Sequence, residues 1–393
     1  MDVFDKHQSY HSYRTVMKII GLWPYSNSIY VCIQRLWLLI FLLGQIIFQI
    51  VMLLRSEITL QNCTLISFTI CPFIIIFLRY IGFMIFFPTV KFLFHHIQME
   101  ENIIQDSIEA QIRTKFINDS CHMIDILFWI TYALIAFFSM LLLCPMILDF
   151  INPLNESRTR IIHYFTVFSY NRIIYIDILC LNYIFIAIIA SLSIICMESM
   201  IGFYSYHASL FFKIIGYRIQ KIVTYLTIFN LSSKQIDSKL VELYRIVDIH
   251  NQVIELINAL NNSGIQFMVP SILIVISVAI NLHQLVNTIL IRKNQLEILI
   301  FLIFLVFQMM IMFICNYSGQ ILIDNSQELL YDLYISTWYF VPLKVQKILL
   351  LIMVRSSITY MISILGVFTP CHAGFSTMLS TSFSYFTLIY STQ

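Results

Sequence analysis

The sequence predicts an all-α membrane protein with seven transmembrane helices. Charged residues make up 11% of its 393 positions, against about 25% in typical soluble proteins. Apolar residues reach 59%, which leaves too few polar side chains to cover the surface of a soluble fold. The apolar residues also gather in runs of about 20, the length of a helix that crosses a bilayer.

Seven apolar runs are predicted to span the membrane. They lie at 36–54, 65–87, 126–147, 178–200, 266–289, 296–316 and 371–391. The last run is rich in Ser and Thr, and the run at 348–368 competes with it for the role of seventh span. Because Arg355, Ser356 and Ser357 interrupt that competing run, we expect it to lie partly outside the lipid.

The Lys and Arg residues of the connecting segments are unevenly distributed. With the N-terminus in the cytoplasm, the inside segments hold 16 of them and the outside segments hold 6. Because cytoplasmic loops carry the excess of Lys and Arg, we expect the N-terminus inside and the C-terminus outside. The chain then divides into four regions. Residues 1–35 form a cytoplasmic segment, and residues 36–316 form the ligand-binding bundle with its cytoplasmic helical loops. Residues 317–370 form a cytoplasmic assembly region, and residues 371–393 form the last, pore-lining span.

Two of the inside segments are predicted to form amphipathic helices. In 91–120, Ile104, Ile108 and Ile112 recur every four residues among polar side chains. An apolar stripe of similar spacing runs through 233–262. We therefore expect a cytoplasmic layer of helices beneath the membrane-spanning bundle.

Several kinds of chemistry are excluded by composition and spacing. The nine glycines are at least eight positions apart, so neither a P-loop nor a dinucleotide fingerprint is present. The nine cysteines show no metal-ligand spacing, and the adjacent His95 and His96 would point about 100° apart on a helix. The net charge of +2 argues against a nucleic-acid partner. We expect no metal, no cofactor and no enzymatic activity.

Four segments carry a resemblance to a known family. They are HASLFFKIIGYRIQKI (207–222), HNQVIELINALNNSGIQFMVP (250–270), YDLYISTWYFVPLKVQKILLLIMVRSS (331–357) and SFSYFTLIYS (382–391). In this order and at this spacing they resemble insect odorant receptors. The resemblance is closest to the large sets of odorant receptors found in ants, bees and wasps. The first 150 residues match that family only in topology.

The resemblance implies a function as well as a fold. Members of the family are ligand-gated, non-selective cation channels, expected to be tetramers formed with an obligate odorant co-receptor and without G proteins. The chain would then be a tuning subunit that binds a small apolar volatile in the plasma membrane of an olfactory sensory neuron. The related gustatory receptors end on a Thr-Tyr and a later Gln-Phe. Ser384, Ser391 and Thr392 depart from that ending, which favours the odorant branch.

A site for a volatile should be an aromatic cage with one or two hydroxyls. The outer halves of the second, third, fourth and sixth spans, where the family's pocket is implied to lie, supply such residues at helical spacing. The predicted ligand-binding residues are Phe73, Phe77, Tyr80, Tyr132, Ala136, Ser139, Met140, Leu143, Tyr183, Ala187, Ile189, Phe301 and Phe304. The competing interpretation of each is helix packing or lipid contact in a chain with 33 Phe.

Arg79 is the basic residue within a predicted span. A basic residue at membrane depth can be a ligand or ion partner. Arg79 also lies within reach of the cytoplasmic surface, so we expect snorkelling or a structural ion pair instead. Glu198, near the inner end of the fourth span, is expected to pair within the cytoplasmic layer.

Two further functional regions lie in the C-terminal part of the chain. Aromatic and apolar residues in the segment before the last span are predicted to form a subunit interface, with intrachain packing as the alternative. These residues are Tyr334, Trp338, Pro342, Leu350 and Val354. The family's last helix implies a gate and a polar ring at Leu388, Ser391 and Thr392. The alternative for these three is packing of the helix end.

Smaller features of the outer segments leave alternatives open. Sequons begin at Asn62 and Asn155, and either is a candidate for glycosylation. Cys144 and Cys180 lie near the outer ends of two spans and either pair or stay as free thiols. A gustatory-type channel, a secondary transporter and a G-protein-coupled receptor are the competing functions. No repeats or ionisable midplane pairs favour the transporter, and the charge bias opposes the G-protein-coupled receptor.

Overall fold

The computed structural model describes residues 8–26, 28–56, 59–99, 103–104, 106–152, 158, 160, 162, 173–228 and 232–391. Within these residues the chain is helical, with one isolated β-bridge between Ile364 and Phe368 and no strand. The helices are α2 (Gln8–Ile19), α3 (Ile29–Arg55), α4 (Leu60–Ile85), α5 (Phe87–Met99), α6 (Ser107–Ile151), α7 (Ile173–Ile228), α8 (Ser233–Asn262), α9 (Ile265–Asn287), α10 (Gln295–Ile335), α11 (Leu343–Ser356) and α12 (His372–Ser391), with the short helices η3 (Thr288–Arg292) and η4 (Trp338–Phe340). The predicted all-α class is confirmed.

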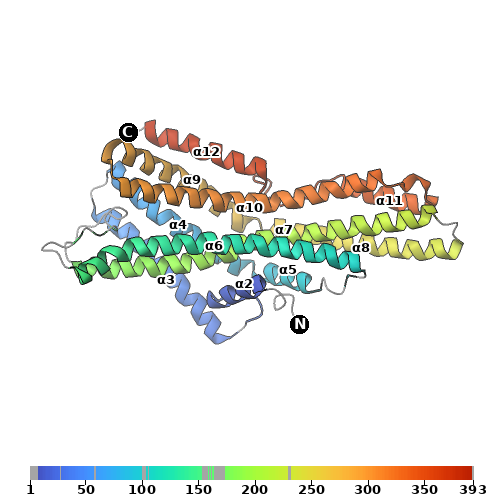
Figure 1. The fold of residues 1–393 in the computed structure, drawn as a ribbon, viewed down its shortest axis with the longest axis horizontal. Helices are drawn as coiled ribbons and strands as arrows, with labels where there is room; N and C mark the ends of the chain where they lie inside the picture. The colour runs from blue at the N-terminus through green and yellow to red at the C-terminus, as the bar shows by residue number, and fades with distance from the viewer. Residues whose placement is uncertain are drawn as a thin grey trace.

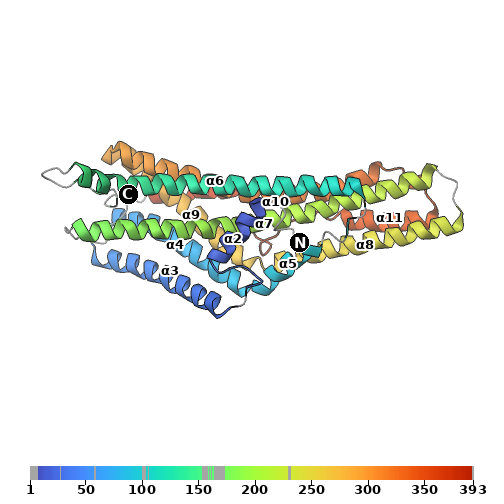
Figure 2. The ribbon, with the colours of Figure 1, turned by 60° about the horizontal axis from the view of Figure 1, so that its bottom comes forward.

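The molecule is elongated and has two parts (Figures 1 and 2). The bundle contains α3, α4, α9, α12 and one half each of α6, α7 and α10. The stem contains α8, α11 and the other halves of those three helices. With 45, 56 and 41 residues, α6, α7 and α10 are each roughly 60–85 Å long. Because a bilayer core is about 30 Å thick, these helices extend well beyond it.

The predicted spans correspond to helices of the bundle. Among the described residues, six helices are long and apolar enough to cross a membrane. They are α3, α4, α6, α7, α9 continued by η3, and α10. The seventh predicted span is α12, whose 20 residues suffice in length although its hydroxyls make it less apolar. The competing run at 348–368 divides between α11, which lies in the stem, and an irregular segment.

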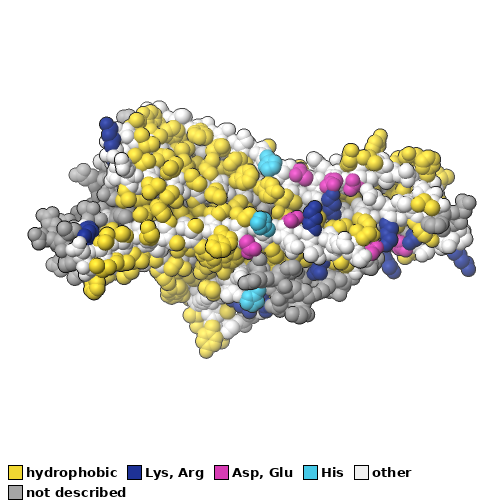
Figure 3. Space-filling model, viewed as in Figure 1, with side chains coloured by type: hydrophobic (Ala, Val, Ile, Leu, Met, Phe, Trp, Pro, Cys, Tyr) yellow, Lys and Arg dark blue, Asp and Glu magenta, His cyan; other side chains and the backbone are white. Residues whose placement is uncertain are grey.

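The surface divides in the same way as the fold. On the face in Figure 3 a broad apolar band covers the bundle, while acidic and basic side chains gather over the stem. A few basic side chains also lie at the loop end of the bundle, beyond the band. An apolar band between two charged ends is the surface that a bilayer requires.

The helix α7 is the centre of the core. It packs against α6 and α10 along the molecule, and nearly all of its residues from Ile195 to Ile215 are buried. At the N-terminal end of the chain, α2 docks on this helix through Tyr13, whose hydroxyl donates to the carbonyl of Cys196 at 2.9 Å. The predicted cytoplasmic N-terminal segment therefore contains a helix that belongs to the core.

The last helix is attached to the bundle at its first turn. The Oδ1 atom of Asn316 on α10 accepts from the backbone N–H of Cys371 at 3.2 Å, and Gln320 accepts from that of His372 at 3.2 Å. At Gly319 the backbone of the incoming segment comes so close that an added Cβ would lie 2.1 Å from the carbonyl oxygen of Pro370. A side chain at this position would therefore displace the start of α12.

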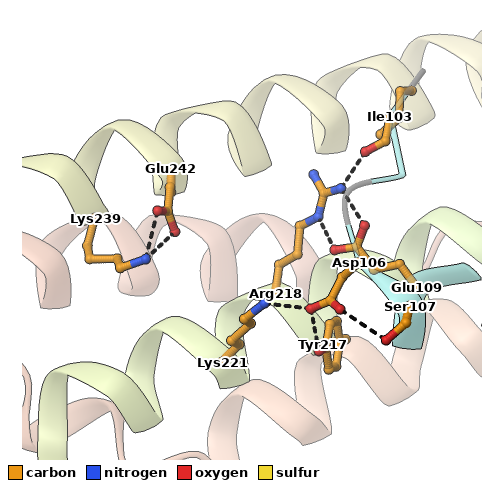
Figure 4. Close-up of polar contacts among 9 residues, drawn as sticks. All are labelled: Ile103, Asp106, Ser107, Glu109, Tyr217, Arg218, Lys221, Lys239 and Glu242. Atoms are coloured by element: carbon orange, nitrogen blue, oxygen red, sulfur yellow. Dashed lines mark hydrogen bonds and ion pairs between the residues drawn. The ribbon is translucent and has the colours of Figure 1, made fainter.

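The stem is held by ion pairs between distant parts of the chain (Figure 4). Arg218 on α7 donates to both carboxylate oxygens of Glu109 on α6, at 2.7 and 2.8 Å, and to the carbonyl of Ile103 at 2.6 Å. Nearby, Asp106 accepts from Lys221 at 2.6 Å and from the hydroxyl of Tyr217 at 3.1 Å. The hydrogen bond from Lys221, followed by that from Tyr217, lowers the pKa of Asp106 to about 2.

We expect the Gly319→Ala variant to be destabilised by about 1–3 kcal/mol, because its methyl group overlaps the Pro370 carbonyl. The matched control is Gly44→Ala in α3, where an added Cβ meets nothing within 4 Å and the helix gains up to about 1 kcal/mol. Thermal unfolding of the purified protein compares the two. Equal melting temperatures for the two variants would contradict this account of the α10–α12 contact.

A second prediction concerns His250, which is buried on α8 between Phe212 and Tyr360. Burial, followed by the charge of Arg355, lowers its pKa to about 4. The unfolded state binds this proton below about pH 6.5, so stability falls as the pH decreases from about 6.5 to 4, by up to about 3 kcal/mol. His250→Phe should reduce that dependence in thermal unfolding, whereas His95→Phe, at an exposed position, should not. Identical pH profiles for His250→Phe and the unmodified chain would refute the assignment.

Candidate ligand-binding cavity

A cavity of about 230 Å³ lies inside the bundle between α4, α6, α7, α9 and α10. Its walls are almost entirely apolar. The larger apolar side chains of the lining are Phe68, Pro72, Phe73, Ile75, Ile76, Leu134, Ile135, Phe138, Leu142, Ile162, Tyr183, Ile186, Ile194, Met197, Ile274, Phe304, Phe307 and Ile311. The volume is below the range of about 300–1,000 Å³ that holds drug-sized ligands, so the cavity fits a smaller molecule.

The end of the cavity nearer the loops is an aromatic corner. The rings of Phe68 and Phe304 meet edge to face with centroids 5.6 Å apart, and Phe138 meets Phe304 at 5.9 Å. Ile162 also belongs to the lining. Two positions before it, Arg160 pairs with Asp149 at 2.6 Å and with Asp177 at 2.8 Å. Through Arg160, these ion pairs join Asp149 on α6 to Asp177 on α7.

The end nearer the stem is polar. Arg79 on α4 and Glu198 on α7 both line the cavity there and form an ion pair with each other. The thiol of Cys315 on α10 donates to the second carboxylate oxygen of Glu198 at 2.5 Å. Since three helices meet in this cluster, it fixes their relative positions at this end of the cavity. Arg79 therefore forms the structural ion pair that was one of the two expectations for it. Its partner is Glu198, which was expected to pair within the cytoplasmic layer.

Comparison with known proteins identifies the family. The model of the 7tm Odorant receptor family matches residues 93–383, more than half of the chain. This chain belongs to the 7tm odorant receptor family. No curated protein sequence matches it.

Two solved structures share the fold of this odorant receptor. The insect olfactory receptor OR5 from Machilis hrabei in complex with eugenol is similar with a TM-score of 0.77 and 12% sequence identity, over 98% of this chain and 97% of that chain. A second structure of OR5 from Machilis hrabei matches over the same shares with a TM-score of 0.76 and 12% identity. At this identity the likeness establishes the fold.

Four of the predicted ligand-binding residues line the cavity of the odorant receptor. Phe73 lies on α4, Tyr183 and Ala187 lie on α7, and Phe304 lies on α10. The hydroxyl of Tyr183 is hydrogen-bonded to the amide of Gln49 on α3. Contact of these four residues with a ligand stays a prediction, and the structure supplies the geometry for it.

The predicted face of α6 is corrected by the structure. Tyr132, Ala136 and Met140 are exposed on the outside of the bundle, with 46% of Tyr132 and 65% of Met140 accessible. Ser139 and Leu143 are half-buried and do not line the cavity. The cavity face of α6 is instead formed by Thr131, Leu134, Ile135, Phe138 and Leu142. Because this part of α6 is apolar on all sides, spacing alone does not identify its inner face.

Four other predicted residues pack next to the cavity instead of lining it. Phe301 is fully buried against Phe68, with ring centroids 5.1 Å apart. Ile189 and Tyr80 belong to the main core, where the hydroxyl of Tyr80 donates to the carbonyl of Ile20 at 2.9 Å. Phe77 packs in a separate cluster beside Phe73. For these positions the structure supports the packing interpretation.

Several lining residues were absent from the sequence prediction. Pro72 and Gln308 are examples for which a signal exists, because prolines and amides in a membrane-spanning helix often mark a cavity. The other missed residues, such as Ile76 and Ile186, resemble any buried aliphatic residue. Nothing in their spacing separates them from helix packing.

The predicted assembly residues lie at the end of the stem. Tyr334, Leu350 and Val354 are exposed, while Trp338 and Pro342 are half-buried. In α12, Leu388 is 62% accessible and Ser391 is exposed, whereas Thr392 lies outside the described residues.

The remaining sequence features concern modification and metals. Asn62 lies in the first turn of α4, and Asn155 lies outside the described residues. All nine cysteines are free, including Cys144 and Cys180. Within the described part of the chain, no group of three His, Cys, Asp or Glu side chains could hold a metal ion.

We expect truncation of Phe73 to weaken ligand responses, because Phe73→Ala removes an aromatic wall of the cavity. The loss should be about tenfold or more in half-maximal concentration. Met140→Ala is the matched control, since that side chain points outward from α6. Dose–response curves of the expressed receptor, normalised to surface delivery, measure both. Equal shifts for the two variants would show that the cavity is not the ligand site.

Proposed function

We propose that this chain is the odorant-binding tuning subunit of a heteromeric, ligand-gated, non-selective cation channel at the plasma membrane. The observation that carries the proposal is the apolar cavity between the helices of the membrane-spanning bundle. An apolar space of this size takes up small volatile molecules from the membrane or the surrounding fluid by burial of their surface. OR5 from Machilis hrabei, which shares the fold, was solved in complex with eugenol.

The proposed orientation has the stem and the N-terminus in the cytoplasm. It is supported by the excess of Lys and Arg in the segments that belong to the stem and to the N-terminal region. Asn62 would then face the outside as a candidate for glycosylation, together with Asn155. Epitope tags at the two termini, stained on intact cells, test the orientation. Surface staining of an N-terminal tag would refute it.

The proposed pore-lining element is α12. Its hydroxyls give it a polar side, and several of them bond back to carbonyls of their own helix, as Thr381 does to Thr377 at 2.7 Å. Hydroxyls satisfied in this way can face either protein or hydrated cations. Leu388 is exposed and is the proposed gate, with Ser391 and Thr392 as the proposed polar ring. None of the described residues of α12 is acidic, so strong calcium selectivity is not expected from this subunit.

The proposed subunit interface is the apolar surface at the end of the stem. Its exposed members come from the end of α10, from η4 and from α11, and they are Tyr334, Tyr339, Phe340, Leu343, Leu350, Leu351 and Val354. A group of large apolar side chains on the charged part of the molecule is typical of a protein–protein contact. The proposed partner is the odorant co-receptor, in a tetramer.

The function is tested by whole-cell current in cells that express this chain with and without the co-receptor. We expect a fast, odorant-evoked cation current in cells with both chains that persists when G proteins are blocked. In this mixed channel, Leu388→Ala and Ser391→Glu should change resting leak or ion permeability, and the order of odorant potencies should stay the same. Loss of the current when G proteins are blocked would favour a G-protein-coupled receptor. Solute uptake without current would favour a secondary transporter.

The interface is tested by a charge placed within the exposed apolar surface. Val354→Asp should reduce co-purification with the co-receptor at least severalfold, because a buried unpaired carboxylate opposes association. Val241→Asp on α8 is the matched control, since Val241 is also an exposed valine of the stem but lies outside this surface. Unchanged co-purification of the Val354→Asp variant would exclude this surface as the interface.

A further inference from the structure

A second hollow of the molecule lies between α6 and α10. It is an open groove of about 1290 Å³, to which α7 contributes Tyr206 and Lys213 and α12 contributes Phe375. The groove shares none of its lining residues with the ligand-binding cavity. Its volume exceeds the range of about 300–1,000 Å³ that is typical of small-molecule sites. The groove therefore fits an occupant larger than a volatile.

The groove crosses the boundary between the apolar band and the charged stem that Figure 3 shows. On α6 no charged residue lies between Asp125 and Asp149, and on α10 none lies between Glu297 and Asp324. On the bundle side of this change the lining is apolar and includes Ile126, Ile130, Leu305, Val306, Met309 and Met310. On the stem side it is polar and includes Lys115, Asp119, His122, Lys213, Asn325 and Glu328. A matching occupant is apolar at one end and polar at the other.

The length of the groove corresponds to one leaflet of a bilayer. From Lys115 to Ile130 the lining follows α6 for about 22 Å. One leaflet with its head groups is about 20–22 Å thick, half the thickness of a whole bilayer. Tyr317 of α10 lies in the lining between the apolar and the polar residues, as tyrosines do at the level of the head groups. A membrane phospholipid therefore has both the length and the polarity that the groove requires.

The charges at the polar end of the groove are balanced. Lys213 on α7 forms an ion pair with Glu328 on α10. On α6, Lys115, Asp119 and His122 follow one another at intervals of four and three residues, so they share one face, and all three are exposed. A cation and a carboxylate side by side match a head group that carries both a phosphate and an ammonium.

We propose that this groove binds one phospholipid from the leaflet on the stem side, with phosphatidylethanolamine as the preferred lipid. Its phosphate accepts from Lys115 and His122, and its ammonium donates to Asp119. An acyl chain lies between Ile126 on α6 and Val306 on α10. Phosphatidylcholine has no N–H to donate to the carboxylate, and an anionic head group would add a negative charge to a balanced set.

The bound lipid also reaches the start of α12. The ring of Phe375, in the first turn of that helix, meets the ring of Phe313 on α10 with centroids 5.5 Å apart, and both residues line the groove. The lipid therefore supports the attachment of the last helix, and its binding should stabilise the fold. Because binding is measured without a current, the inference stands apart from the proposed channel function.

The experiment uses the full-length receptor, purified in detergent and incubated with equal amounts of phosphatidylethanolamine, phosphatidylcholine and phosphatidylglycerol that carry the same oleoyl chains. Native mass spectrometry counts the lipids retained by each chain, and thermal unfolding measures the stabilisation by each lipid alone. Asp119→Asn tests the head group, with Asp248→Asn, at an exposed position of α8 outside the groove, as its matched control. Val306→Trp fills the seat of the acyl chain. Its matched control is Leu302→Trp, at an exposed position of α10 that does not line the groove.

We expect one retained phosphatidylethanolamine per chain, preferred about fivefold or more over the other two lipids. Asp119→Asn should bring phosphatidylethanolamine and phosphatidylcholine to equal retention, and Val306→Trp should reduce the retention of every lipid severalfold. Both controls should behave like the unmodified receptor.

Three results would overturn the inference. The first is equal retention of the three lipids by the unmodified receptor, or a preference for phosphatidylglycerol. The second is a preference that Asp119→Asn leaves unchanged, or retention that Val306→Trp leaves unchanged. The third is displacement of the bound lipid when the co-receptor joins the complex, because the groove would then be covered by protein.

Discussion

The structure depends on one constraint, which is that an apolar surrounding offers no hydrogen-bond partners to the backbone. In the bundle the described backbone is therefore almost entirely helical, with prolines inside α4, α6 and α9 as local exceptions to the hydrogen-bond pattern. Three helices, α6, α7 and α10, extend this pattern without a break into the stem. The cavity lies between their bundle halves, and the stem ion pairs lie between their other halves.

The same constraint governs the polar side chains. Hydroxyls on α6, α7 and α12 donate to carbonyls of their own helices, so they are accommodated without a partner helix. Charged groups at depth are paired, as Arg79 is with Glu198. In the stem, the pairing of Arg218 with Glu109 serves a different purpose, because it joins two helices outside the apolar band.

The attachment of α12 differs from that of the other helices in the bundle. Its first turn is fixed by Asn316 and Gln320, and Gly319 permits the close approach of the preceding segment. Farther along, many of its side chains are exposed, including Phe383, Tyr385 and Leu388. Asn316 follows Cys315 directly in α10. The polar end of the cavity and the anchor of α12 thus occupy adjacent positions of one helix, which under the proposed function joins ligand site to pore.

The sequence by itself determined the helical class, the approximate spans and the family, because runs of about 20 apolar residues and the C-terminal motifs are local signals. It also found four cavity residues, among them Phe73 and Tyr183. The inner face of α6 was decided only by the tertiary structure. Tyr132 and Thr131 are neighbours in sequence, yet one faces outward and the other faces the cavity. Where a helix is apolar on all sides, the spacing of its apolar residues does not indicate which face is buried. The packing of α6 against α7 and α10 determines which of its sides faces inward.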